Sequence, residues 1–253
     1  MNFYDAIASH YDDIVDGPAR SEAAARFATW LTGSHRVRRA LDVACGTGLH
    51  ARAMAGRGVQ VVAADASEAM LQQARTCPGE ADDRIEWLHA PMETIAQRVT
   101  GSFDAVVCMG NSLPHLLTDA RLRQTVRGFR TVLADEGLAA VQMLNYDRIL
   151  ARRERVVGVT RRGHREYIRF YDFLPKQIRF NILELDWQDD RCRHDLHQTH
   201  LAPYRAEQLC EAFREAGFED VDLFGGLPDE PFDVSKSEGL LLIARCKKAD
   251  GGK

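Results

Sequence analysis

The stretch Leu41-Asp42-Val43-Ala44-Cys45-Gly46-Thr47-Gly48-Leu49 decides the fold of this chain. An apolar strand runs into a turn that contains two glycines, and the residues that follow read as a helix. Gly46 and Gly48 allow a tight turn and let the backbone approach a ligand where a side chain would collide. The next apolar run, residues 59–64, delivers Asp65 to the same sheet edge, where a carboxylate can accept hydrogen bonds from both hydroxyls of a ribose. The pattern predicts a nucleoside cofactor at the carboxyl ends of parallel strands.

Two classes of cofactor fit this pattern. Residues 46–51 satisfy G-x-G-x-x-G/A, with an acid 17 residues after Gly48, as in dinucleotide sites. Asp42, inside the strand, is hard to reconcile with a pyrophosphate because both groups are anionic. It suits an amino-acid cofactor, whose ammonium and sulfonium groups are positive. The segment from Leu41 to Gly48 resembles motif I of class I S-adenosylmethionine-dependent methyltransferases, and Asp65 then matches the ribose-binding acid of that family. S-adenosyl-L-methionine is therefore the expected cofactor.

Apolar runs alternate with helical patterns along most of the chain. Strands are predicted at residues 40–44, 59–64, 84–89, 103–109, 137–143, 220–225 and 239–247. Helices are predicted at residues 20–32, 49–56, 67–75, 119–134 and 204–216. Asp135-Glu136-Gly137 is expected to end the long helix before the fifth strand. The alternation predicts an α/β fold, a Rossmann-like seven-stranded, mostly parallel sheet with helices on both faces.

Residues 154–200 follow a different pattern, with period-two alternation and turn signals at Arg162-Gly163 and Gln188-Asp189-Asp190. This predicts three or four antiparallel strands, inserted between the fifth parallel strand and the next helix. The expected organisation is a class I methyltransferase domain over residues 1–150 and 201–247 with an N-terminal lid. An inserted antiparallel β-subdomain over residues 151–200 would cover the substrate.

Composition limits the classes of partner. A net charge of −4 offers no general attraction for nucleic acid. The chain lacks a run of about 18 apolar residues and the layout of a signal peptide, so no membrane span is expected. The 6 cysteines include no C-x-x-C pair, which suits reduced thiols in a cytoplasmic protein. Cys192 and His194 would share one face of a strand and His197 the other, so no metal site is expected. A small-molecule acceptor is the expected partner, and the oligomeric state is left open.

The N-terminal sequence Tyr4-Asp5-x-Ile7-Ala8-x-x-Tyr11-Asp12 resembles the start of many small-molecule methyltransferases, in which an aromatic residue closes over the cofactor. A spacing of seven puts both tyrosines on one helical face, and plain packing is the alternative role. At Pro91 the family usually has an acid or amide for adenine, so recognition here falls on backbone groups and on apolar contact from Met92. The residues expected to bind the cofactor are Tyr4, Tyr11, Asp42, Ala44, Gly46, Gly48, Asp65, Ala66, Met70, Pro91, Met92 and Met109.

Two further segments resemble the glycine N-methyltransferases and their sarcosine-methylating relatives. Residues 108–116 are similar to the C-x-G-N-S-x-x-H-L loop of that subfamily, and residues 145–150 are similar to its N-Y-D-x-I-L. In the subfamily an arginine before N-Y-D binds the substrate carboxylate. Here that residue is Leu144, which argues against glycine itself. Eight arginines lie within residues 148–169, most of them suited to a solvated face, and Arg169 is the candidate for an anionic substrate group.

Methyl transfer from a sulfonium is an in-line displacement, so the protein must align the reactants, exclude water and present a neutral amine or a deprotonated hydroxyl. The expected catalytic residues are Asn111, which would orient the amine, His115 and Tyr204. His115 capping its own loop and Tyr204 packing on the next helix are the alternatives. The expected substrate-binding residues are Asn111, His115, Asn145, Tyr146, Arg169, Tyr171 and Tyr204. The resemblance implies methylation of a small-molecule amine, and the alternatives are an O-methyltransferase, an RNA methyltransferase or a non-catalytic cofactor-binding partner protein.

Overall fold

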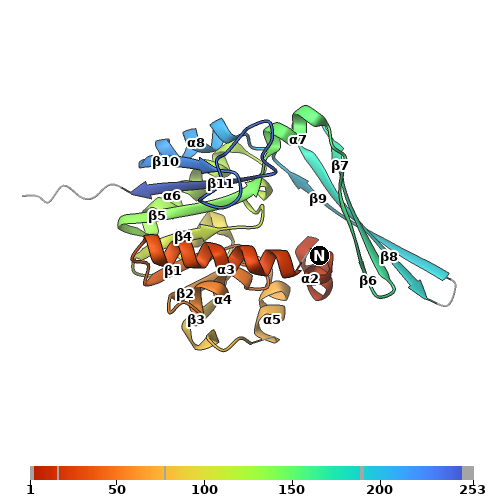
Figure 1. Ribbon diagram of the computed structural model, residues 1–253, viewed down its shortest axis with the longest axis horizontal. Coiled ribbons are helices and arrows are strands. Elements are labelled where there is room, and N and C mark those ends of the chain that lie inside the picture. Colours follow the sequence, from red (N-terminus) through yellow and green to blue (C-terminus); the bar gives the residue numbers. More distant parts are fainter. Residues whose placement is uncertain (1–2, 16, 77, 189–190, 247–253) are drawn as a thin grey trace, which may run out of the picture.

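The computed structural model describes residues 3–15, 17–76, 78–188 and 191–246 (Figure 1). Its larger sheet, sheet A, has seven strands in the order β10-β11-β5-β4-β1-β2-β3. The strands are β1 (Arg39–Val43), β2 (Gln60–Asp65), β3 (Ile85–His89), β4 (Phe103–Cys108), β5 (Leu133–Leu144), β10 (Phe218–Phe224) and β11 (Gly239–Cys246). All neighbours pair in parallel except at β11, which is antiparallel to both β5 and β10. The predicted seven-stranded, mostly parallel sheet is confirmed.

Helices cover both faces of sheet A. The helices are α3 (Gly17–Ser34), α4 (Leu49–Ala55), α5 (Glu68–Thr76), α6 (Asp119–Val132), α7 (Tyr146–Arg152) and α8 (Ala206–Glu215), with short 3-10 turns η2 (Asp82–Arg84), η3 (Met92–Gln97) and η4 (Leu113–His115). Because side chains alternate along a strand, Leu41 and Val43 of β1 join the core under α6 and α8, while Ala40 joins the core under α3 and α4. The strand order reverses between β1 and β4, so ligands are expected beyond the carboxyl ends of these two strands.

A second, four-stranded antiparallel sheet, sheet B, extends beyond that edge of sheet A (Figure 1). Its strands are β6 (Val156–Arg162), β7 (Arg165–Phe173), β8 (Ile178–Gln188) and β9 (Arg191–Leu201). The chain reaches it through α7 and returns to the main sheet through α8. Where β9 ends, the Ala202 N–H donates to the Pro114 carbonyl at 2.7 Å, which joins sheet B to the loop after β4. The predicted antiparallel insertion is confirmed.

The N-terminal segment consists of α1 (Phe3–Ile7), η1 (Ala8–His10) and α2 (Tyr11–Ile14). Ile7 and Ile14 pack in one cluster with Met70 of α5 and with Tyr167 and Ile182 of sheet B. The N-terminal segment therefore lies between α5, which packs on sheet A, and sheet B, and it contacts both (Figure 1).

The expected break before the fifth strand is wrong. Asp135-Glu136-Gly137 lies within β5, which begins at Leu133 directly after α6 ends at Val132. The register between β4 and β5 shifts at this point, and Glu136 has a φ of 58°. The polar residues thus form a bulge inside a strand, which the sequence pattern mistakes for a turn.

The remaining boundaries differ by a few residues. The turn at Arg162-Gly163 is where β6 ends, whereas Asp189, Asp190 and Lys247 lie outside the described residues. Within the part of the chain that the structure describes, no helix combines the length and apolarity that crossing a membrane requires.

Candidate cofactor and acceptor site

The turn between β1 and α4 is built from left-handed backbone. Ala44, Gly46 and Gly48 have φ values of 57°, 57° and 84°. A Cβ added at Gly46 would meet no atom within 4 Å, whereas one at Gly48 would lie 2.3 Å from Cη2 of Trp87. Glycine is therefore required at the two positions for different reasons. At Gly46 it leaves open space beside the turn, and at Gly48 it makes room for the Trp87 ring.

Asp42 is a buried acid, and one of its carboxyl oxygens has no hydrogen-bond partner among the described residues. The residue is 1% exposed, and the oxygen without a partner is Oδ2. Burial, followed by the negative charge of Asp65, raises the pKa of Asp42 to about 8. An unsatisfied carboxylate oxygen of this kind suits a cationic ligand group.

Asp65 ends β2 with its carboxylate held rigidly. Oδ2 accepts from the Gly46 N–H and Oδ1 accepts from the Ser67 N–H, both at 2.8 Å. Burial raises the pKa of Asp65, and these backbone donors oppose that shift. Each oxygen retains acceptor capacity for a further donor, as a pair of ribose hydroxyls would supply.

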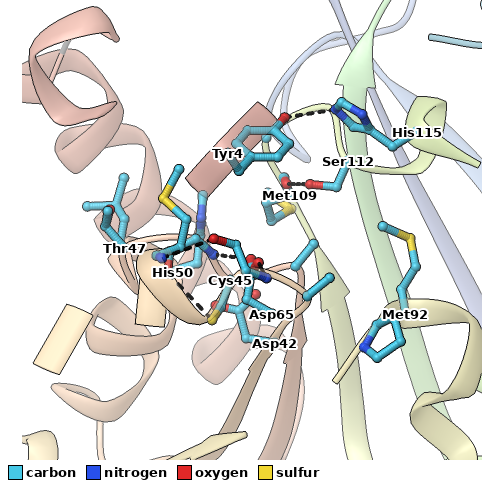
Figure 2. Close-up of a pocket in the computed structure, with 18 of the residues that line it drawn as sticks. Tyr4, Asp42, Cys45, Thr47, His50, Asp65, Met92, Met109, Ser112 and His115 are labelled. Atoms are coloured by element: carbon cyan, nitrogen blue, oxygen red, sulfur yellow. Dashed lines mark hydrogen bonds between the residues drawn. The ribbon is translucent and has the colours of Figure 1, made fainter. Parts of the chain in front are cut away.

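A cavity of about 240 Å³ lies over this turn (Figure 2). Eleven of the twelve residues expected to bind the cofactor line it: Tyr4, Tyr11, Asp42, Ala44, Gly46, Asp65, Ala66, Met70, Pro91, Met92 and Met109. Gly48 is the exception, because the ring of Trp87 occupies the space beside it. The sheet edge therefore gathers residues from four strand ends and the N-terminal segment around one ligand-sized space.

Three side-chain hydrogen bonds join the N-terminal segment to loops that follow β1, β2 and β4. The Ser67 hydroxyl donates to Asp5 at 2.6 Å, and the Thr47 hydroxyl donates to Asp12 at 3.0 Å. The Tyr4 hydroxyl lies 2.8 Å from Nε2 of His115, in the loop after β4 (Figure 2).

Both N-terminal tyrosines line the cavity although they do not share one continuous helix. Tyr4 lies in α1 and Tyr11 begins α2, with the 3-10 turn between them. Their ring centroids are nevertheless 6.2 Å apart, in edge contact. This closed position is compatible with the lid that the sequence suggests.

A second cavity, of about 600 Å³, adjoins the first. The two share the residues Tyr4, Tyr11, Arg20, His50, Met109, Gly110 and His115. Four of the expected substrate-binding residues line the second cavity: Asn111, His115, Arg169 and Tyr171. The shared wall is where groups bound in the two cavities can meet, and we call it the junction.

Asn111 follows the left-handed Gly110 and is itself left-handed, with a φ of 68°. Its Nδ2 donates to the Tyr146 hydroxyl and its Oδ1 accepts from the Leu144 N–H, both at 3.0 Å. The side chain therefore joins the loop after β4 to the end of β5. A strained residue tied down in this way is typical of a functional loop, although the oxygen expected to orient an amine already accepts one hydrogen bond.

Three expected substrate residues do not line either cavity. Asn145 is buried, where its Nδ2 donates to the carbonyls of Val234 and Ser237. Tyr146 is buried behind Asn111, and the Tyr204 hydroxyl donates to the Leu116 carbonyl. Each of these side chains instead holds in place a loop near the cavities.

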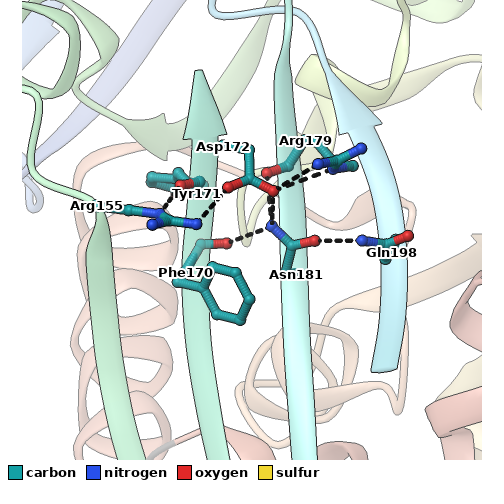
Figure 3. Close-up of polar contacts among 7 residues, drawn as sticks. All are labelled: Arg155, Phe170, Tyr171, Asp172, Arg179, Asn181 and Gln198. Carbon is teal, nitrogen blue, oxygen red and sulfur yellow. Dashed lines mark hydrogen bonds and ion pairs between the residues drawn. The ribbon is translucent and has the colours of Figure 1, made fainter. Parts of the chain in front are cut away.

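Most of the arginine-rich segment has structural partners. Of the eight arginines within residues 148–169, all of which the structure describes, Arg169 alone lines a cavity. On the other face of sheet B, Asp172 accepts hydrogen bonds from Arg155, Arg179 and Asn181 (Figure 3). The pair with Arg179 lowers the pKa of Asp172. This cluster links neighbouring strands of sheet B.

Arg20 is the residue that the sequence interpretation missed. It lines both cavities, and its guanidinium lies 5.6 Å from the centroid of the Tyr11 ring. Arg20 lies three residues before Ala23 and seven before Phe27 in α3, and all three residues line the second cavity. This helical spacing is the only feature of the local sequence that could have indicated a role for Arg20. A periodic stripe of that kind is common to most buried helix faces, so the sequence does not single Arg20 out.

The buried Asp42 makes the stability of the ligand-free protein fall as the pH rises from 6.5 to 8. Its folded pKa of about 8 exceeds the ordinary value of 3.8, so the folded state retains a proton that the unfolded state releases. His50 and His115, with pKa values lowered to about 4, act in the opposite direction, but only below pH 6.5. We expect unfolding free energy to decline by about 1 kcal/mol per pH unit in this window, as measured by urea denaturation. Asp42→Asn should flatten the slope, and an unchanged slope would contradict the assignment.

Comparisons with known proteins agree with this geometry. Residues 40–137 match the family described as a methyltransferase domain. A glycine/sarcosine N-methyltransferase of Aphanothece halophytica is 25% identical over 231 residues, covering 88% of this chain and 82% of the relative. One from Parasynechococcus marenigrum (strain WH8102) is 28% identical over 230 residues, covering 89% and 78%.

Solved structures share the fold. The CcbJ methyltransferase of Streptomyces caelestis superposes with a TM-score of 0.82 at 21% identity, covering 97% of this chain and 98% of that one. The S-adenosylmethionine-bound amino pentose methyltransferase CalS10 of Micromonospora echinaspora gives 0.71 at 22% identity, with 97% of each chain covered. The matched domain, the relatives that align over most of this chain and the shared fold together support a class I S-adenosylmethionine-dependent methyltransferase that resembles the glycine/sarcosine N-methyltransferase subfamily.

Proposed function

We propose that this enzyme transfers the methyl group of S-adenosylmethionine to the nitrogen of a small-molecule amine. The observation that carries the proposal is the junction, at which the first cavity, lined by Asp42 and Asp65, opens onto the larger second cavity through Met109, Gly110 and His115. When bound, the cofactor supplies a methyl group already activated by the positive sulfur. The protein must therefore position an acceptor and keep it neutral.

The residues of the first cavity suit S-adenosylmethionine group by group. The orphaned oxygen of Asp42 suits the cofactor's ammonium, and the rigid Asp65 carboxylate suits the ribose hydroxyls. Arg20, the sole arginine among the described residues of this cavity, suits the carboxylate. Ala66, Met70, Pro91 and Met92 offer an apolar slot for adenine.

The protonation states at the junction favour nitrogen over oxygen. Burial lowers the pKa values of His50 and His115 to about 4, and it raises the pKa of Tyr4 well above its usual range. These groups stay neutral and are weak bases near pH 7. A hydroxyl acceptor needs a base to become nucleophilic, whereas a neutral amine already carries a lone pair. His115 would accept or donate a hydrogen bond to the amine rather than carry its proton.

The N-terminal segment and sheet B would enclose the reaction. Phe3 and Tyr4 on one side, and Tyr171 and Phe180 on the other, line the second cavity and exclude water from it. In this proposal residues 151–200 act as the substrate cover and the N-terminal segment as the lid of the domain formed by residues 1–150 and 201–247. The names of the aligned relatives, all acting on amines, support the same acceptor atom.

An assay of S-adenosylhomocysteine release tests the proposal. The panel comprises glycine, sarcosine, dimethylglycine, larger amines, phenols and tRNA. We expect turnover on an amine, with kcat/KM rising about tenfold per pH unit up to the ammonium pKa of that acceptor, and no inflection near pH 6.5 from His115. Turnover confined to phenols or tRNA would overturn the proposal. So would tight cofactor binding without turnover on any amine, which would indicate a non-catalytic partner protein.

A further inference from the structure

The second cavity is much larger than an amino acid without a side chain requires, and most of the residues that line it are apolar or aromatic. Its volume of about 600 Å³ lies in the range of roughly 300–1,000 Å³ typical of sites for drug-sized ligands. We infer, on the basis of the proposed function, that the acceptor is an amine attached to a bulky, mainly apolar body such as a ring system. The amine would lie at the junction and the body would fill the space between sheet B and the N-terminal segment.

The floor and roof of the cavity are mainly apolar, and Arg169, which pairs with Ile182 across β7 and β8, is the charged side chain of the roof. Leu144 at the end of β5 and Leu201 at the end of β9 lie on one side. Tyr171, Phe180 and Ile182 come from the inner face of sheet B, where β7 and β8 pair in register. The ring centroids of Tyr171 and Phe180 are 5.7 Å apart, so these residues form a continuous aromatic surface.

The remaining walls repeat this character. Ile7 and Ile14 of the N-terminal segment are 2% and 1% exposed, and Phe27 of α3 is fully buried. Leu227, from the loop between β10 and β11, closes another side. The wall is thus assembled from five separate parts of the chain that all supply apolar groups. A ligand of matching shape would gain from burial what a small polar ligand cannot.

Polar side chains near the junction are largely committed to the protein. Gln142 accepts from the Gly110 N–H at 2.9 Å, and Asn111 bonds to Tyr146 and Leu144. Arg26 pairs with Asp229 at 3.3 Å. The side chain of Leu144 cannot bind a carboxylate, unlike an arginine at the same position. At Leu144 the acceptor therefore meets an apolar surface, and Arg169, whose Nη2 donates to the Thr160 hydroxyl at 3.3 Å, is a cationic group on another wall.

The roof is stiffened from its outer side. Asp172 lies between the inward-facing Tyr171 and Phe173 of β7. On the outer face it accepts hydrogen bonds from Arg179 of β8 and from Arg155, the residue before β6 (Figure 3). A roof held in this way keeps the cavity open, so that a small amine would not gain contacts by collapse of the wall.

Calorimetry on the full chain saturated with S-adenosylhomocysteine tests the inference without requiring turnover. The probes are 2-phenylethylamine, tryptamine and cyclohexylamine, compared with glycine and sarcosine. We expect the bulky amines to bind at least about tenfold more tightly, as burial of a large apolar group implies. Glycine or sarcosine binding as tightly as the best bulky amine would overturn the inference, and so would the absence of binding by all three bulky amines.

A matched pair of variants locates the binding. Ala23 lines the second cavity from an exposed position on α3, and Ala25, two residues on, is exposed and lines neither cavity. Ala23→Trp should weaken the bulky amines by about tenfold or more, and Ala25→Trp should leave their affinity unchanged. Equal effects of the two substitutions would overturn the assignment to this cavity. Binding of bulky amines with no methylation of any amine would refute the proposed function but leave the preference of the cavity for a bulky apolar body standing, whereas turnover of glycine alone would do the reverse.

Discussion

Asp42→Asn is expected to weaken S-adenosylmethionine binding by at least about 30-fold, equivalent to about 2 kcal/mol or more. Asparagine retains the shape of the side chain, but it cannot ionise to face the cofactor's ammonium as the Asp42 carboxyl can. Because Asp42 is buried, water does not solvate the cofactor's ammonium in its place, and the unpaired ammonium would be costly to bury.

The same substitution should make the ligand-free protein more stable than the wild type at pH 6.5, and the difference should be larger at pH 8. The native carboxylate is costly to ionise in its buried position, and its raised pKa measures that cost. Calorimetric titration of the cofactor and urea denaturation at the two pH values check both halves. Loss of affinity accompanied by loss of stability at pH 8 would mean that Asp42 serves the fold rather than the ligand.

Gly48→Ala is expected to destabilise the fold by about 2–4 kcal/mol. The new Cβ would lie 2.3 Å from the Trp87 ring, and alanine would have to adopt a φ of 84°. The ring cannot move freely, because the Arg52 guanidinium lies 5.3 Å from its centroid and is itself held by Asp82. The expected loss of stability is the sum of the steric clash with Trp87 and the strain of a left-handed alanine.

Gly46→Ala is the matched control, with the opposite balance of effects. Its Cβ would enter open space, so only the strain at a φ of 57° remains, which costs about 1–2 kcal/mol. The methyl group would instead take up room beside the cofactor cavity, and we expect cofactor affinity to fall by about tenfold or more. Equal losses of stability in the two variants, measured by thermal unfolding, would contradict the separate roles of these glycines.

The cofactor half of the site could be predicted from local sequence because a strand, a turn and a helix place it. Asp42, Gly46 and Asp65 follow from position along two successive strands, and all three line the first cavity. The sequence pattern predicts that Gly48 is required, but not why. The reason is the Trp87 ring, which comes from β3 and leaves no room for a Cβ at Gly48. The mistaken turn at Asp135-Glu136-Gly137 has a similar origin, because a bulge depends on the neighbouring strand.

The acceptor half depended on contacts between distant segments. Asn145, Tyr146 and Tyr204 are substrate candidates by resemblance, yet their partners are Val234, Asn111 and Leu116, which no spacing predicts. Arg20 shows the converse, since an ordinary helix position becomes a cavity wall once α3 packs beside the N-terminal segment.

The sequence by itself determined the α/β class, the antiparallel insertion and the cofactor-binding turn, because periodicity and glycine positions act over a few residues. Only the tertiary structure decided the size and apolar character of the acceptor cavity. Its walls come from Phe3, Phe27, Leu144, Phe180 and Leu227, and the distances between these residues are set by the packing of two sheets and the N-terminal segment. A cavity is the space that such packing leaves, and no local pattern encodes it.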